Sequence, residues 1–565
     1  MEKSPERIRI VGINARFSHS CLALFYVRNE LEKHCPGVVG EIVQATINDN
    51  VFELLLRLSE GAPRVVFFSA SIWNSILVER LCRDLHLCLP GCRMVLGGPQ
   101  AAVLGARLGP EFTTVVLGEI EAVDPAFYRD LLSGTLRRSY AALSTEGPRP
   151  PFGNPYRPED FSGPLANRSI YYESSRGCPF HCSYCLSAAE HGVRHKDLAE
   201  VLAELSLILA CRPKVVRFVD RTFNDQPQRA LAIWHMLAAC GGETLFHFEI
   251  APERFSEEMF AFLAGIPPGR FQFEIGVQST NPATLAAINR RIDPEVAAGT
   301  VRRLAGPGNI HLHVDLILGL PYETRESFAG SFRDIFALGA HYVQMGLLKI
   351  LPDTPISRQA ADWGYRYSSD PPYGVFCSQW LDHPGLAELY HFSEVVERFV
   401  NTRYFVSLWS YLRRINEDAF AFFEKLLAIC RRQDFFQRAP TQELLCTILV
   451  TAAEERHDRA LLVELLRYDW LRCGFRFLPD ALQLPADVES PAATRSALYQ
   501  RLPPVLPGLY QPSERNHFFR KSFFLRVSRE LLREIGLEEG GAESVICFLA
   551  EREKSLYGLQ RVVCL

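Results

Sequence analysis

The sequence predicts an α/β protein in three parts: an N-terminal doubly wound domain, a central partial parallel β/α barrel, and a mainly helical C-terminal domain. Two observations support this. Short, almost wholly apolar runs alternate with longer amphipathic segments in two separate series, as in parallel strands that helices cover on both faces. The alternation stops near residue 356, and helical patterns dominate from there to the C-terminus.

The composition of the 565-residue chain is that of a globular protein, with 48% hydrophobic and 22% charged residues. At roughly 150 residues per domain, this length favours three or four domains. The net charge of −4 gives no global electrostatic reason to expect nucleic acid or an anionic membrane. No apolar run approaches the roughly 18 residues of a membrane span, and the N-terminus lacks the pattern of a secretory signal. We therefore expect a soluble cytoplasmic protein without a membrane partner, and nucleic acid is not an expected partner.

The first series predicts a doubly wound domain over residues 1–145. Its strand patterns lie at 8–13, 40–46, 64–70, 93–98 and 113–118, and its helical patterns at 22–34, 50–60 and 74–89. The ligand of such a domain binds beyond the carboxyl ends of the strands. Small or acidic residues follow three of these strands, namely Ser69, Ser71, Gly97, Gly98, Gly118 and Glu119. The small residues would let a flat ligand or its tail approach the backbone closely. The Gly-x-Gly-x-x-Gly fingerprint of dinucleotide-binding domains is absent.

A proline-dense stretch and a second βα series follow. Six prolines between residues 146 and 168 predict a semi-rigid linker. Strand patterns then recur at 169–175, 214–220, 245–251, 270–278, 311–319 and 342–350. Six such units fit a partial parallel barrel over 169–355, in which the chemistry gathers at the carboxyl ends of the strands. Helical patterns at 393–405, 419–432, 460–471 and 527–536 predict a helical accessory domain over 356–565.

Three of the sixteen cysteines, Cys178, Cys182 and Cys185, cluster on the loop that leaves the first strand of the predicted barrel. The other thirteen are scattered through apolar surroundings and are typical of small buried hydrophobic residues. Three thiolates at C-x3-C-x2-C spacing can hold one face of a cuboidal iron–sulfur cluster and leave one iron open to a substrate. A zinc site usually uses two separated C-x-x-C pairs, and here only His181 and His191 could complete it. Zinc and three structural cysteines are the weaker alternatives.

This motif, with the aromatic Tyr184 before its third cysteine, resembles the fingerprint of the radical S-adenosylmethionine (SAM) superfamily. The resemblance covers about 169–355. It implies that Cys178, Cys182 and Cys185 hold a four-iron four-sulfur cluster whose free iron binds the methionine end of SAM. It also implies that one electron, from a donor such as flavodoxin or ferredoxin, cleaves SAM to a 5′-deoxyadenosyl radical. The cofactors supply this chemistry, while the protein positions them and keeps water out.

The later strands of the series resemble oxygen-independent coproporphyrinogen oxidase and the methylthiotransferases. In those families the residues that match Glu249, Gln278, Arg290 and Asp315 contact the methionine or ribose end of SAM, and Ser279 follows Gln278 in the same motif. The Gly-Gly-Glu element of the family is absent. Residues 219–224 stand in its place, so Asp220 and Asn224 are expected near the amino group of SAM. For each residue taken singly, the alternative is a polar group that caps a neighbouring helix.

The N-terminal domain resembles the cobalamin-binding domain that precedes the barrel in cobalamin-dependent radical SAM enzymes. The serine loop at 69–71, the Gly97-Gly98 turn and the Gly-Glu-Ile-Glu sequence at 118–121 carry this resemblance. The Asp-x-His-x-x-Gly motif, whose histidine ligates cobalt in many of these domains, is absent after the first strand. His19 is either a replacement for that lower ligand or an ordinary histidine at a helix start. The alternative for the whole domain is a vestigial fold that binds nothing.

The whole architecture also resembles a family defined by a conserved C-terminal domain of unknown function, through the phrases at 72–74, 220–224, 246–251 and 272–280. In that domain, a basic and aromatic stretch at 515–526 fits an ordinary amphipathic helix better than a base-stacking surface.

We therefore expect an enzyme with a four-iron four-sulfur cluster, SAM and cobalamin that methylates an unactivated carbon of an unknown small-molecule or peptide substrate. No catalytic residue is assigned. The alternatives are the same cofactors without methyl transfer (a rearrangement or oxidation) and a non-catalytic cobalamin or redox sensor. Methylthiolation of tRNA is a weaker alternative, because it requires three N-terminal cluster cysteines and a β-rich tail.

Overall fold

The computed structural model describes residues 6–142, 150–189, 192–475, 477–483, 522–537, 545–553 and 555–564. The chain divides into two compact units. The first comprises residues 1–250, 349–357 and 367–375, and the second comprises 251–348, 358–366 and 376–565. This division falls within the second series of strands, and the domain limits expected at 145, 168 and 355 stay predictions. The expected α/β class, with parallel sheets in both units, is confirmed.

The first unit opens with a six-stranded parallel sheet of order β2-β1-β3-β4-β5-β6. Its strands are β1 (Glu6–Asn14), β2 (Val38–Thr46), β3 (Val65–Ser69), β4 (Arg93–Gly97), β5 (Thr113–Leu117) and β6 (Ser139–Ala141). Each apolar run of the first series is one of the strands β1 to β5. Side chains on both faces are buried along most of these strands, although the N-terminal half of β2 is partly exposed. The order reverses between β1 and β3, which is the point where doubly wound sheets bind ligands.

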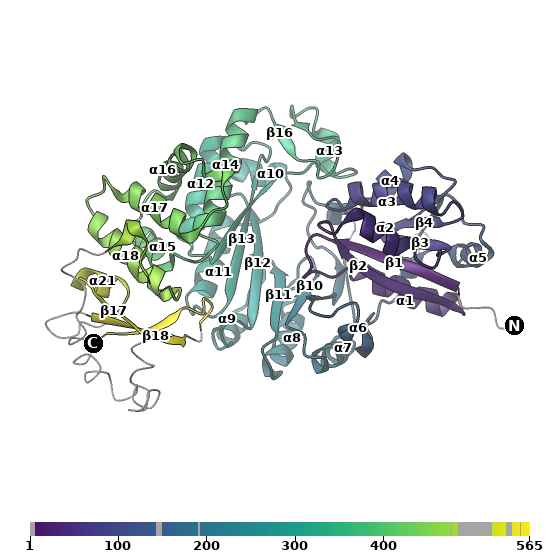
Figure 1. The fold of residues 1–565 in the computed structure, drawn as a ribbon, viewed down its shortest axis with the longest axis horizontal. Helices are drawn as coiled ribbons and strands as arrows, with labels where there is room; N and C mark the ends of the chain where they lie inside the picture. Colours follow the sequence, from purple (N-terminus) through teal and green to yellow (C-terminus); the bar gives the residue numbers. More distant parts are fainter. Residues whose placement is uncertain are drawn as a thin grey trace. The chain divides into compact units, whose positions relative to one another are not determined.

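Helices cover both faces of this sheet, as the sequence predicts (Figure 1). They are α1 (Ala23–His34), α2 (Val51–Ser59), α3 (Ser75–Cys88), α4 (Ala101–Arg107) and α5 (Ala126–Ser133). Residues of α2, α3 and α4 share one buried core with Val11 and Phe68. On the other face, Phe67 of β3 meets Phe127 of α5 with ring centroids 6.2 Å apart. The side chain of Asn50 caps α2 by accepting hydrogen bonds from the first-turn amides, which is why this helix starts where it does.

The rest of the first unit contains three more parallel strands and a hairpin. The strands are β7 (Ile170–Tyr172), β10 (Val215–Phe218) and β11 (Leu245–Ile250), and the helices are α6 (Pro158–Ser162), α7 (Leu198–Ala210) and α8 (Pro227–Ala239). The strand predicted over 169–175 ends at Tyr172. After it, β8 (Ser175–Gly177) pairs antiparallel with β9 (Val193–His195), so the hairpin encloses the cysteine loop.

The second unit contains the parallel strands β12 (Phe271–Gln278), β13 (His311–Leu318) and β14 (Tyr342–Leu347). The helices beside them are α9 (Glu257–Ala264), α10 (Pro282–Ala287), α11 (Pro294–Ala305) and α12 (Arg325–Ala337). Burial alternates along β12 and β13. Phe273 and Val314 lie in the core, whereas Glu274, Gln278 and Asp315 share the opposite, less buried face.

The described part of the chain beyond residue 354 is mainly helical, as expected. Its helices are α13 (Pro355–Gln359), α14 (His383–Phe399), α15 (Val406–Arg414), α16 (Ala419–Arg432), α17 (Gln442–Ala453), α18 (Arg459–Arg472) and α21 (Arg529–Glu534), and its short strands are β15 (Arg366–Tyr367) and β16 (Val375–Cys377). The helix predicted over 393–405 instead starts at His383, where Asp382 caps it, and ends at Phe399.

One prediction for the C-terminal region is wrong. The tail contains an antiparallel sheet of β17 (Phe523–Arg526), β18 (Val545–Arg552) and β19 (Gln560–Cys564). Residues 523–526 of the predicted amphipathic helix are therefore strand, and residues 515–521 lie outside the described part of the chain. In β17, apolar and charged side chains share one face. The sequence therefore shows no alternation with the period of two that marks a strand, and a helical period of 3.6 residues was predicted instead. The sheet also weakens the argument against methylthiolation that relied on a helical tail.

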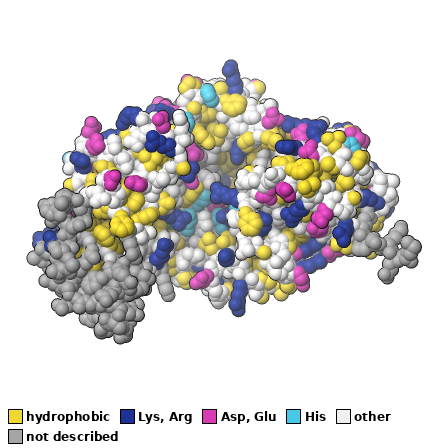
Figure 2. All heavy atoms as spheres, viewed as in Figure 1, with side chains coloured by type: hydrophobic (Ala, Val, Ile, Leu, Met, Phe, Trp, Pro, Cys, Tyr) yellow, Lys and Arg dark blue, Asp and Glu magenta, His cyan; other side chains and the backbone are white. Residues whose placement is uncertain are grey.

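Two surface features bear on the sequence analysis. Acidic and basic side chains are interspersed over the face that Figure 2 shows, in line with the small net charge. Among the described residues, no helix is both long and apolar enough to cross a membrane.

Candidate functional site

A cavity of about 340 Å³ lies against the first sheet and reaches the carboxyl ends of its strands. Its apolar walls come from the strands and from α1, and include Ile10, Phe67, Val95 and Val116. Five of the residues predicted to meet a ligand line it: Ser69, Gly97, Gly98, Gly118 and Glu119. The sequence therefore located the cavity, while the ligand contacts of these residues stay predictions.

The two glycines that follow β4 have different reasons to be glycine. Gly98 has a φ of +95°, and a Cβ there would lie 2.7 Å from the carbonyl oxygen of Ala70, so the fold itself excludes a side chain. A Cβ on Gly97 would meet no atom within 4 Å. The fold does not require glycine at position 97. Its missing side chain instead keeps the backbone open to the cavity.

Two other N-terminal predictions, Ser71 and His19, lie outside the cavity lining. The Ser71 amide donates to Asn74 Oδ1 at 2.8 Å, and Asn74 Nδ2 donates to the carbonyls of Ile13 and Ser69, so this loop is fastened to two strands. The His19 ring packs edge-on against Tyr171, with centroids 6.2 Å apart. Burial lowers the pKa of His19, and the nearby cations Arg217 and Arg16 lower it further.

The cysteine loop is closed by the β8–β9 hairpin. Gly177 has a φ of +95°, and a Cβ there would lie 2.2 Å from the carbonyl of Gly192, so only glycine fits beside Cys178. Cys178 and Cys182 are buried and Cys185 is partly exposed. The Cys178 sulfur lies 3.6 Å from Thr222 Oγ1 in the loop after β10. Tyr184, before the third cysteine, is partly buried.

Within the described residues, no three His, Cys, Asp or Glu side chains converge closely enough to hold a single metal ion. Thiolates that bind separate irons of a cuboidal cluster have no need to converge on one point. The three cysteines therefore fit an iron–sulfur cluster, because thiolates are the usual ligands of such clusters and because one hairpin loop carries all three.

The carboxylate of Asp220 holds the start of this hairpin. It accepts hydrogen bonds from the Ser174 amide at 3.0 Å and from the hydroxyls of Ser174 and Ser175 at 2.6 Å each. Burial raises the pKa of Asp220, and these hydrogen bonds oppose that rise. Sequence reasoning assigned Asp220 to SAM. The structure shows that its oxygens position the loop that carries the cysteines.

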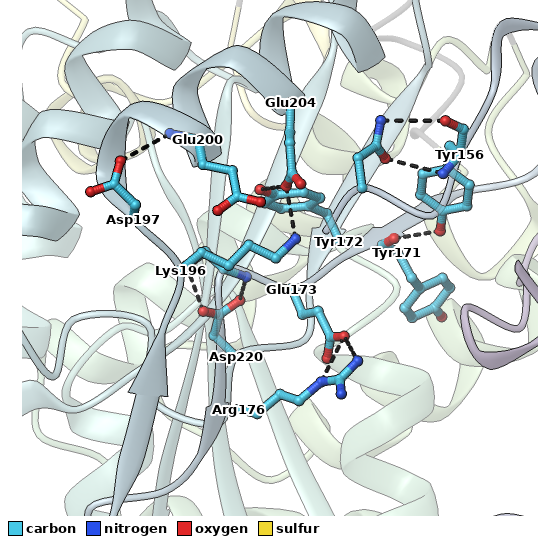
Figure 3. Close-up of polar contacts among 12 residues, drawn as sticks. Tyr156, Tyr171, Tyr172, Glu173, Arg176, Lys196, Asp197, Glu200, Glu204 and Asp220 are labelled. Atoms are coloured by element: carbon cyan, nitrogen blue, oxygen red, sulfur yellow. Dashed lines mark hydrogen bonds and ion pairs between the residues drawn. The ribbon is translucent and has the colours of Figure 1, made fainter. Parts of the chain in front are cut away.

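Other residues of the first unit complete this region (Figure 3). Lys196 and Tyr172, the last residue of β7, both donate hydrogen bonds to the buried carboxylate of Glu204, at 2.7 and 2.5 Å. Asn224 is fully buried, and the Glu249 carbonyl accepts from the Phe223 amide at 2.8 Å. The loop after β10 and the end of β11 therefore lie together, as the predicted roles of Asn224 and Glu249 require.

In the second unit, Gln278 and Arg290 lie together around Gly276. Arg290 Nη2 donates to the Gly276 carbonyl at 2.6 Å. Gln278 has a φ of +75°, the strand register shifts between residues 276 and 278, and a Cβ at 276 would lie 2.3 Å from Gln278 Nε2. Strained backbone of this kind tends to occur where a site needs a particular side-chain direction.

Asp315, also assigned to SAM, belongs to a polar cluster that sequence reasoning missed. His313 Nε2 lies 3.1 Å from Asp315 Oδ1, and His313 Nδ1 lies 3.9 Å from Glu274 Oε2. Burial lowers the pKa of His313, but the nearby carboxylates of Asp315, Glu274 and Glu397 together outweigh burial, so the net shift is upward. Burial raises the pKa of Asp315. The alternation His-x-His-x-Asp along residues 311–315 was the available signal for this cluster.

Ser279 serves the fold in this structure. It is fully buried, and its hydroxyl donates to Glu323 Oε1 at 2.6 Å. Burial raises the pKa of Glu323 to about 8, against the effect of the neighbouring hydroxyls of Ser279 and Ser331. This bond ties the loop after β12 to the loop after β13.

Comparison with known proteins agrees with the fold. Residues 172–335 match the radical SAM superfamily, and residues 361–524 match a protein family of unknown function, DUF4080. An uncharacterized methyltransferase of Pyrococcus horikoshii is 22% identical over 408 residues, which cover 68% of this chain and 86% of that protein. The cobalamin-dependent radical SAM methyltransferase TokK of Streptomyces tokunonensis is 25% identical, and the match covers 52% of this chain and 48% of TokK.

Among solved structures, the cobalamin-dependent SAM radical enzyme OxsB with aqua-cobalamin bound aligns with a TM-score of 0.58 and 13% identity, over 82% of this chain and 80% of OxsB. At this identity the likeness establishes the fold alone. The chain is therefore similar to the radical SAM superfamily over residues 172–335, which include the cysteine hairpin, and similar to a family of unknown function over residues 361–524.

Proposed function

We propose that this enzyme is a cobalamin-dependent radical SAM methyltransferase that acts on an unactivated carbon of a small-molecule or peptide substrate. The observation that carries the proposal is that one compact unit holds both the cysteine hairpin and the cavity at the carboxyl ends of the first sheet. The methyltransferases among its relatives support the reaction class.

The residues that would hold each group follow from the site. Cys178, Cys182 and Cys185 would hold the cluster, and the residues that the sequence predicts as SAM contacts would bind SAM. When bound, the cluster and SAM would supply a radical that takes hydrogen from carbon, and cobalamin would supply the methyl group. The protein itself would fix the cysteine loop through Asp220 and shape the carboxyl end of β12 through Gly276. An external donor such as flavodoxin or ferredoxin would supply the electron.

The cavity fits part of a corrinoid. Its volume of about 340 Å³ is at the small end for ligand pockets, so it would admit the tail of cobalamin and leave the ring outside. Gly97 supports this fit, since its backbone is open to the cavity for no reason internal to the fold. His19 does not line the cavity, and because the corrin ring would lie outside the cavity, His19 as a ligand of cobalt stays a prediction.

The first test is the iron and corrinoid content of protein purified without oxygen from cells supplied with hydroxocobalamin. About four irons and about one corrinoid per chain are expected. Iron without corrinoid would contradict the proposal for the N-terminal cavity and leave the radical SAM assignment standing. Deuterated methyl-SAM then separates methyl transfer from a rearrangement or oxidation, and a methylthio product would identify methylthiolation.

The cluster assignment has a matched control. Cys182→Ala should abolish formation of 5′-deoxyadenosine, because it removes one of the three thiolates. Cys211→Ala should leave it unchanged, since the Cys211 sulfur lies 3.8 Å from the Leu207 carbonyl at the end of α7 and belongs to no predicted site. A wild-type protein with an intact reduced cluster that cleaves no SAM would favour the sensor alternative.

A further inference from the structure

Arg176 lies in β8, two residues before the first cysteine of the motif, and its guanidinium meets three carboxylates. It donates to Glu119 at 2.9 Å, to Glu121 at 2.9 Å and to Glu173 at 2.5 and 2.9 Å. Figure 3 shows its approach to Glu173. Glu119 and Glu121 follow β5 of the first sheet, whereas Glu173 follows β7. One guanidinium therefore joins the end of the first sheet to the hairpin that carries the cysteines.

This cluster is largely withdrawn from water. The Arg176 side chain is 15% exposed and that of Glu121 is 7% exposed. The Phe152 ring lies 4.1 Å from the Arg176 guanidinium carbon, and Arg194 of β9 adds a second cation by donating to Glu119 at 2.6 and 2.8 Å. Because these charges are shielded, removing one partner costs far more than in a surface ion pair. The planar guanidinium of Arg176 also presents several donors in a fixed arrangement, which the ammonium group of a lysine cannot reproduce.

The same groups form part of the cavity wall. Arg176, Glu119, Glu121 and Glu173 all line the cavity, together with the open backbone at Gly97. A molecule seated in the cavity therefore touches the groups that hold the cysteine hairpin. Burial opposes ionisation of Glu119, but its bonds with Arg194 and Arg176 lower its pKa overall, so the carboxylate is charged when it meets either partner.

We propose that Arg176 is a positioning residue. It couples the occupancy of the N-terminal cavity to how tightly the cysteine hairpin retains its cluster. This inference rests on the proposed function, since it takes cobalamin as the occupant and an iron–sulfur cluster on the hairpin. Cobalamin binding stabilises the arrangement of Glu119 and Glu121, and Arg176 transmits that arrangement to the residues next to Cys178.

The test is the rate at which an iron chelator removes iron from the anaerobically purified protein, with and without hydroxocobalamin. Corrinoid binding is followed separately by its visible absorption. In the wild type, bound hydroxocobalamin should slow iron release by about fivefold or more, the scale of a typical coupling between two sites. In Arg176→Gln, iron release should be the same with and without the corrinoid. If Arg176 had only a structural role, Arg176→Gln would speed iron release by the same factor with and without the corrinoid, and the slowing by bound corrinoid would remain.

Two further variants keep the test decisive where Arg176→Gln loses its cluster. Arg176→Lys and Glu121→Gln should retain iron and show a reduced response to the corrinoid. The matched control is Arg157→Gln, which breaks an exposed ion pair with Glu32 in the same unit and should respond like the wild type. A full response in both Arg176→Lys and Glu121→Gln would overturn the coupling.

The outcomes separate this inference from the proposed function. A wild-type protein that binds no corrinoid would overturn both. A wild-type protein that binds corrinoid but releases iron at an unchanged rate would overturn the coupling alone and leave the cofactor assignment intact.

Discussion

The buried carboxyl of Glu323 should make this protein less stable as pH rises. Glu323 is 1% exposed, accepts one hydrogen bond from Ser279 and has no partner for its second oxygen among the described residues. Burial raises its pKa from 4.5 to about 8. A carboxyl with a raised pKa binds its proton more tightly in the folded state, so its stabilising effect is present below about pH 4.5 and lost as pH rises through 8.

The magnitude follows from that shift. Each pKa unit corresponds to about 1.4 kcal/mol, so Glu323 lowers the free energy of unfolding, relative to its value below pH 4.5, by about 3 kcal/mol at pH 7 and by about 5 kcal/mol at pH 9. Glu323→Gln keeps an oxygen that accepts from Ser279 and removes the titrating proton. Relative to the wild type, this variant should therefore gain stability steadily between pH 5 and pH 9.

The assay is thermal unfolding of the two proteins across this pH range under anaerobic conditions. Glu326→Gln is the control, because Glu326 is exposed in the first turn of α12 and its pKa is lowered by hydrogen bonds that its carboxylate accepts from its own backbone amide and from Thr324. Its difference from the wild type should be flat above pH 5. Parallel pH profiles for Glu323→Gln and the wild type would refute the burial argument.

Three other substitutions test the site. Gly98→Ala should cost more than about 1 kcal/mol of stability, measured by thermal unfolding, because of its positive φ and the clash with Ala70, and should also weaken corrinoid binding. Asn74→Ala removes a buried amide bonded to three backbone groups and should cost roughly 1–3 kcal/mol, seen as a lower unfolding temperature. Arg290→Ala should weaken SAM binding, measured by equilibrium dialysis, without changing iron content, since Arg290 lies beside Gly276 and apart from the cysteine loop in sequence.

Local patterns made most of the fold predictable. The apolar runs of both series became strands because parallel strands bury both faces, and helix α16 occupies the predicted residues 419–432. The hairpin of β8 and β9 was missed because each strand has three residues, too few for a periodic signal. The role of Arg176 was also invisible, since its partners Glu119 and Glu121 lie more than fifty residues away in sequence.

The predicted SAM-binding residues fall into two groups, according to what their polar atoms bind in the structure. Asp220 and Ser279 are buried and bonded to neighbouring loops, so they resemble the alternative reading in which a polar group at a strand end serves the fold. Arg290 and Gln278 instead surround Gly276, where the backbone departs from regular strand geometry. A family motif in sequence marks both kinds of residue equally, because the loop that presents a ligand must be held as firmly as the ligand itself. Substituting Asp220 should therefore disturb the cysteine loop before it disturbs SAM, and only the hydrogen bonds in the structure reveal that order.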